Sequence, residues 1–189
     1  MQSMRTLFFL AALGLPWLAI PKPSSSLFVI KHEGWKLLLL SAVLILGLPY
    51  LTLLAIVNGY LRAMLIHPSL GSALRFLADN VGSISLVALA EEFFFRGYLQ
   101  ETVFSTFWDK RALGPLSLKN LAASSLFGLA HVVTHLSPLE FLQAFNGLAM
   151  GWLVERSGGS IWPAVALHML SNLVVIWFKL LISLNIPWL

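Results

Sequence analysis

Residues 81–107 read VGSISLVALAEEFFFRGYLQETVFSTF, a mostly apolar segment that nevertheless contains four charged residues, Glu91, Glu92, Arg96 and Glu101. A charged side chain at the centre of a membrane helix costs about 2.5–3.5 kcal/mol even on a lenient insertion scale. Several such groups together would strongly oppose insertion if they faced lipid. The segment therefore predicts a helix whose charged face lines a protein interior or a wet cavity.

The spacing of these charges gives the two glutamates different prospects. Glu92 and Arg96 are four residues apart, so they can form an ion pair on one helix face. Glu91 is turned about 100° from Glu92 on a helix and has no such partner four residues away. We expect it to find a partner on another helix or to act as a general base. The alternative is an interfacial charge cluster, with Arg96 and Glu101 extended toward lipid headgroups.

The composition of the whole chain points to a membrane protein. Apolar residues make up 58% of it and charged residues 11%, whereas soluble domains carry about 25% charged residues. The formal net charge is +4, without a dense cluster of basic residues, which argues against a nucleic-acid partner. The absence of cysteine excludes disulfides, thiolate metal sites and cysteine nucleophiles. We expect a multi-pass integral membrane protein covered by a lipid bilayer.

Hydropathy divides the chain into a bundle of about six transmembrane helices, an all-α membrane protein with a polar internal site. We assign one transmembrane domain to residues 1–189, with N-terminal spans in 1–80. The predicted spans are Thr6–Ile20, Leu37–Val57, Val81–Phe107, Asn120–Leu139, Phe141–Val154 and Ser160–Phe178.

A second polar signal is the stretch FGLAH, residues 127–131, followed one turn later by His135. Two histidines at this spacing can hold a metal in the HExxH helix of zinc proteases, but Val132 stands where that motif needs its glutamate. His135 precedes a Ser-Pro pair, and a histidine at a helix end suits the helix dipole. We therefore interpret His131 as functional and His135 as a helix-end residue.

A third signal is HMLSN, residues 168–172, within the last predicted span. His168 and Asn172 share one helix face, and both can donate hydrogen bonds to a developing oxyanion. The alternative is that they only join helices by hydrogen bonds. Gly147 and Gly151, also four residues apart, are interpreted as a site of close helix packing. A carboxylate, imidazoles and a carboxamide from three helices together fit water activation and attack on a carbonyl.

The order EEFFFR (91–96), FGLAH (127–131) and HMLSN (168–172), each on an apolar segment, resembles the CAAX protease and bacteriocin-processing family, also called the Abi family. Its members are relatives of the type II CAAX prenyl endopeptidase. The resemblance covers about half of the chain, roughly Val81 to Leu180. It implies an all-helical intramembrane endopeptidase and makes residues 81–180 the family's catalytic core.

Carried over by motif position, the resemblance implies that Glu91 activates water with help from His131. His168 and Asn172 would form the oxyanion hole, and Glu92 and Arg96 would brace the helix. It also implies a mechanism without a cofactor. Members of the family are often classed as metalloproteases, so zinc is the alternative.

The resemblance further implies a membrane-embedded or membrane-anchored protein or peptide as substrate, in a bacterial or archaeal cell membrane. Two rival functions remain at this point. One is a proton- or cation-coupled membrane transporter that uses the buried Glu and His residues. The other is a scaffold of the same family that has lost its activity. A transporter predicts paired broken helices in related halves of the chain, and a scaffold predicts a damaged motif; the sequence has neither feature.

Overall fold

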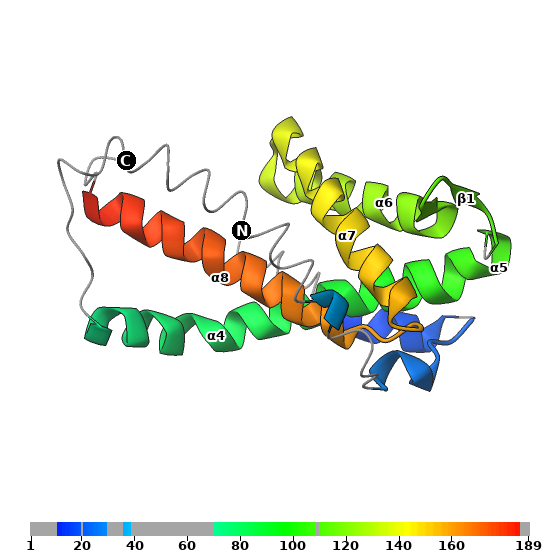
Figure 1. Cartoon of the computed structure of the whole chain (residues 1–189), viewed down its shortest axis with the longest axis horizontal. Helices are drawn as coiled ribbons and strands as arrows, with labels where there is room; N and C mark the ends of the chain where they lie inside the picture. The colour runs from blue at the N-terminus through cyan, green and yellow to red at the C-terminus, as the bar shows by residue number, and fades with distance from the viewer. Residues whose placement is uncertain (1–10, 20, 30–35, 39–69, 109, 186–189) are drawn as a thin grey trace.

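The computed structural model describes residues 11–19, 21–29, 36–38, 70–108 and 110–185, and these form a helical bundle (Figure 1). The described part of the predicted first span is helical at residues 11–18. The predicted span Leu37–Val57 lies outside the described residues except for its first two. Among the helices of the described ranges, none combines the length and apolarity that a membrane crossing requires.

The charged segment of residues 81–107 is helical throughout, but its helix type changes within it. The α-helix α4, Leu70–Glu92, continues directly into the π-helix η3, Phe93–Phe104, and then into the short α5, Ser105–Trp108. The change from α to π comes immediately after the two glutamates. Such wider turns are rare in proteins and occur frequently at functional sites.

Of the remaining helices, α6, α7 and α8 follow predicted segments with shifted ends, whereas η1 lies between two predicted spans. They are η1 at Ser25–Phe28, α6 at Leu118–His135, η4 at Pro138–Leu142, α7 at Gln143–Arg156 and α8 at Trp162–Asn185. The predicted span Asn120–Leu139 therefore ends earlier, at His135. Its last residues belong to the separate 3-10 helix η4, because Leu136 adopts a left-handed conformation (φ 54°) that ends α6.

One feature departs from the all-α prediction. The strands β1, Ala112–Leu113, and β2, Leu116–Ser117, pair antiparallel and join α5 to α6. Gly114 occupies the turn with φ 63°, a conformation that glycine adopts without steric cost. These residues lie between two predicted spans, and strands of two residues are too short to leave a period-two pattern.

The helices pack in two groups that share α7. Helix α6 packs against α7 and η3, while α8 packs against α4 and α7 (Figure 1). Two apolar clusters hold α8 in place. One contains Leu38, Met150, Leu153, Val154, Ala164 and Leu167, and the other contains Leu27, Ala88, Phe93, Ile161 and Val165. This packing brings α8 against the end of α4, where the two glutamates lie.

The glycine pair of α7 accommodates polar side chains rather than a bare helix backbone. A Cβ atom at Gly147 would lie 2.9 Å from Nη2 of Arg96 and 3.2 Å from Oγ of Ser124. A Cβ atom at Gly151 would overlap the side-chain oxygens of Asn120 and Gln100. The predicted close packing is thus present, and the groups that pack against the two glycines are buried polar side chains of η3 and α6.

We expect Gly151→Ala to lower the free energy of unfolding by about 1–3 kcal/mol or more, because the new methyl group overlaps two buried amides that cannot move into solvent. The matched control is Gly82→Ala on the exposed face of α4, where a Cβ atom meets nothing within 4 Å. That change should stabilise the helix slightly. Thermal unfolding of both purified variants checks this, and equal stabilities would contradict it.

Candidate active site

The centre of the candidate site is the imidazole of His168, which α8 places between two carboxylates of α4. Its Nδ1 lies 2.9 Å from Oε1 of Glu92, and its Nε2 lies 3.7 Å from Oε2 of Glu91. His168 is 5% exposed, and the side chain of Glu91 is 12% exposed. Glu92 and His168, 76 positions apart in the chain, thus meet with Glu91 at the junction of α4, η3 and α8.

Glu92 and Arg96 form the predicted ion pair. Nε of Arg96 lies 3.4 Å from Oε2 of Glu92, and both side chains are fully buried. The guanidinium also lies over the ring of Phe127, at 4.9 Å from its centroid. Glu92 therefore uses its two oxygens on two partners, Arg96 in its own helical segment and His168 on α8. A buried carboxylate with two such partners can remain ionised in an apolar core.

Both histidines of the family-like motifs are anchored through Nδ1. Nδ1 of His131 lies 3.0 Å from the carbonyl oxygen of Phe127, one turn earlier in α6. A carbonyl only accepts hydrogen bonds, so this nitrogen carries a proton and donates it. Nδ1 of His168 likewise donates to the carboxylate of Glu92. In both rings Nε2 is the nitrogen left for chemistry.

Phe127 connects the two imidazoles, a role that motif spacing alone did not indicate. Its ring centroid lies 4.4 Å from that of His131 and 6.1 Å from that of His168, in an edge-on arrangement with the latter. Phe95 packs against the same ring at 5.2 Å. The sequence signal that could have indicated this role is the aromatic residue one helical turn before His131.

Two predicted residues are less closely engaged. Asn172 is half-buried one turn beyond His168 in α8, without a hydrogen bond to Glu91, His131 or His168. His135 is exposed, stacks on His131 at 5.9 Å and is the last residue of α6, as its helix-end interpretation predicted. The imidazole in contact with Glu91 is that of His168, whereas the family resemblance gave His131 the part of assisting Glu91.

The zinc alternative depends on whether enough suitable ligands lie together. A zinc ion needs at least three protein ligands when cysteine is absent. Within the described ranges, no group of three or more His, Asp or Glu side chains is placed to hold a metal ion.

We expect Glu92→Gln to lower stability by about 3–5 kcal/mol, because it leaves the guanidinium of Arg96 buried without its counter-charge. The yield of folded protein and its unfolding temperature measure this. The double variant Glu92→Gln/Arg96→Met removes the stranded charge as well, so it should recover part of the loss. Asp79→Asn on the exposed surface of α4 is the control. A double variant less stable than Glu92→Gln would show that the pair does not act this way.

A comparison with known protein families shows the family to which the chain belongs. Residues 73–174, more than half of its length, match the family described as type II CAAX prenyl endopeptidase Rce1-like. This range includes Glu91, Glu92, Arg96, Phe127 and His131, and also His168 and Asn172. No curated protein and no solved structure gives a significant match. The chain therefore belongs to the type II CAAX prenyl endopeptidase Rce1-like family.

Proposed function

We propose that the protein is an intramembrane endopeptidase in which Glu91 activates the water that hydrolyses a peptide bond. The observation that carries this proposal is the position of His168, whose two ring nitrogens face Glu92 and Glu91. Glu92 is committed to Arg96 and His168, while the contact of Glu91 with His168 is longer than a hydrogen bond. Glu91 is thus the carboxylate with free capacity to bind water.

In the proposed reaction, a carboxylate oxygen of Glu91 takes a proton from water as the water oxygen attacks the scissile carbonyl carbon. The carbonyl oxygen becomes an oxyanion in a tetrahedral intermediate. When the C–N bond breaks, Glu91 returns the proton to the leaving amine. The carboxylate ends the cycle in its starting form, so the protons of the step balance without an external acid or base.

Two donors on one face of α8 are proposed to stabilise the oxyanion. Nε2 of His168 donates as part of an imidazolium held between two carboxylates, and the carboxamide of Asn172 donates from one turn further on. His131 presents its Nε2 from α6 and is proposed to assist the proton transfers. Glu92, Arg96 and Phe127 hold these groups in position.

The protein is proposed to be a multi-pass integral membrane protein of a bacterial or archaeal cell membrane. Its proposed substrate is a membrane-associated protein or peptide. Exposed large apolar side chains on α6, η4 and α7 and at the junction of α6 and η4 support the membrane position. These are Val133, Leu136, Leu139, Leu142 and Phe145, each more than half exposed. A surface of this kind fits lipid or a lipid-modified protein. The family's description as a prenyl endopeptidase supports a prenylated or otherwise membrane-anchored substrate.

We expect Glu91→Gln to fold normally and to lose about 10²–10⁴ in cleavage rate, because the amide keeps the shape but cannot accept the proton. The rate can be measured on a prenylated CAAX peptide. Comparative proteomics of membrane proteins from cells with wild-type protein or the variant extends the measurement to other substrates. Asp79→Asn, with an exposed carboxylate on the same helix, is the control. Near-wild-type cleavage by Glu91→Gln would rule out the proposed mechanism.

We also expect the purified protein to retain its cleavage activity in a strong chelator and to contain less than one metal ion per chain. The reason is that its described side chains do not provide three suitably placed ligands. Metal analysis and activity after exhaustive chelation measure this. Activity that disappears with chelation and returns with stoichiometric zinc would establish a metalloprotease instead.

A further inference from the structure

An N-terminal segment outside the family-matched range packs next to the candidate site. Its described part, residues 11–19 and 21–29, contains a helical stretch at 11–18 and the 3-10 helix η1, whereas the family match begins at residue 73. Figure 1 shows this segment in blue beside the start of α8, which it contacts through a main-chain hydrogen bond. None of its residues belongs to the proposed catalytic machinery.

Two aromatic rings of the segment stack on Phe93, the residue that directly follows Glu92. The centroid of the Phe93 ring lies 5.8 Å from that of Trp17 and 5.6 Å from that of Phe28, with interplanar angles of 19° and 27°. Phe93 is 2% exposed and is the first residue of η3. The segment therefore holds the chain at the point where α4 changes into the π-helix, next to both glutamates.

Leu27 fills the space between η3 and the start of α8. It is 2% exposed and belongs to the apolar cluster that contains Phe93 and Val165. A Cβ atom at Gly97 would lie 3.1 Å from Cδ1 of Leu27 and 3.6 Å from Cγ2 of Ile161. The leucine thus lies in close contact with both helical segments, and its size contributes to their separation.

Two hydrogen bonds also join the segment to α8. The carbonyl oxygen of Leu27 accepts from the main-chain N–H of Ile161 at 3.0 Å, and the carbonyl oxygen of Phe28 accepts from Nε1 of Trp162 at 2.8 Å. Trp162 is the first residue of α8, the helix that carries His168. The segment is therefore connected to both elements of the candidate site, the glutamate-bearing α4–η3 helix and the histidine-bearing α8.

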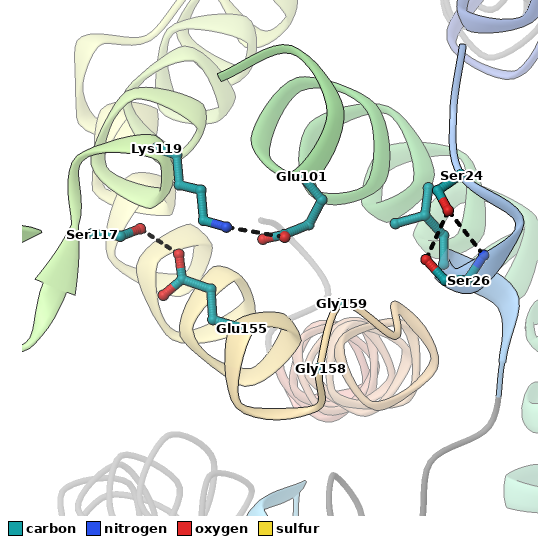
Figure 2. A pocket seen from close by; sticks show the side chains of 9 residues that line it. Ser24, Ser26, Glu101, Ser117, Lys119, Glu155, Gly158 and Gly159 are labelled. Atoms are coloured by element: carbon teal, nitrogen blue, oxygen red, sulfur yellow. Dashed lines mark hydrogen bonds and ion pairs between the residues drawn. The ribbon is translucent and has the colours of Figure 1, made fainter. Parts of the chain in front are cut away.

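The polar side of the segment borders a cavity of about 440 Å³. Figure 2 shows Ser24 and Ser26 on one side of it, with Glu101, Lys119 and Glu155 lining other parts. The two serine hydroxyls lie 2.8 Å apart, and the main-chain N–H of Ser26 donates to Oγ of Ser24, so these hydrogen bonds stay within the segment. Its packing against η3 and α8 comes instead from the apolar residues described above.

The contacts of His168 depend on the separation that the segment helps to set. Its Nδ1 lies 2.9 Å from Glu92 and its Nε2 lies 3.7 Å from Glu91. Hydrogen bonds weaken steeply outside a narrow range of distance and angle. Because close-packed interiors transmit strain, a void left between η3 and α8 would alter these distances.

We propose that Leu27 and Phe28 are positioning residues that hold η3 and α8 at the separation at which His168 contacts Glu92 and Glu91. This inference rests on the proposed peptidase function, and it extends the catalytic unit to residues outside the family-matched range. Both residues act through Phe93 and the start of α8 rather than on the substrate. Their truncation should therefore lower kcat and leave KM unchanged.

The test compares the alanine variants Leu27→Ala and Phe28→Ala of the full-length protein with Leu38→Ala, which truncates a buried leucine of the other apolar cluster. We expect the first two to lower kcat on a prenylated CAAX peptide by about 10–100-fold, because small displacements of reacting groups have effects of this size. Leu38→Ala should reduce stability but keep the wild-type kcat per folded molecule. Leu27→Met, which conserves volume, should recover most of the lost kcat.

A spectroscopic measurement follows the His168 contact without requiring cleavage. In ¹H–¹⁵N spectra of histidine-labelled protein, the Nδ1 proton that His168 donates to Glu92 should be strongly deshielded, and His168→Gln identifies its resonance. We expect this resonance to move upfield in Leu27→Ala and Phe28→Ala. It should keep its wild-type position in Leu38→Ala and in Leu27→Met.

Wild-type kcat or an unchanged His168 resonance in both Leu27→Ala and Phe28→Ala would overturn the inference. An equal fall of kcat in Leu38→Ala would also overturn it, because any loss of packing would then have the same effect. These outcomes leave the proposed function intact as long as the wild type cleaves the peptide and Glu91→Gln does not. If the wild type cleaved nothing, the proposed function would fail, and the resonance alone would decide whether the segment positions His168.

Discussion

The packing around the candidate site depends on the buried carboxylate of Glu92, because an ionised group in an apolar core needs a counter-charge and hydrogen-bond donors. Arg96 compensates it from η3 and His168 from α8. Each partner in turn constrains its own surroundings: the guanidinium needs the face of Phe127 and the open space at Gly147, and the imidazole fixes the rotation of α8 against α4. One carboxylate thus joins α4 and η3 to α8, in addition to the apolar clusters that hold α8 in place.

Similar buried hydrogen bonds orient the two imidazoles of the candidate site. Nδ1 of His168 donates to Glu92, and Nδ1 of His131 donates to a main-chain carbonyl. These bonds leave Nε2 available in both rings before any substrate binds. Glu91 stays outside this network of short contacts, so its carboxylate can take and return a proton while the core around Glu92 keeps its charge. Adjacent residues of identical chemistry thereby receive different tasks, one in positioning and one in the proposed catalysis.

Buried polar side chains continue along η3 beyond the site. Glu92, Arg96 and Gln100 are spaced four residues apart and are fully buried, and Nε2 of Gln100 donates hydrogen bonds to Glu101 and Glu155. Helix α7 admits this row because glycine occupies the two positions facing it, Gly147 and Gly151. The sequence suggested this glycine pair as a site of close helix packing. In the structure, the space beside the two glycines holds one guanidinium and two amide groups.

The sequence by itself determined the helical class, the three polar motifs, the Glu92–Arg96 pair and the helix-end position of His135. These depend on contacts between residues close in the chain, whose geometry a helix fixes. The tertiary structure decided that His168 meets both glutamates, that Phe127 joins the two imidazoles and that Glu155 shares a cavity with Lys119. Such contacts join residues far apart in the chain, and the rotation and approach of whole helices determine them. No periodicity in a single segment records how one helix is turned toward another.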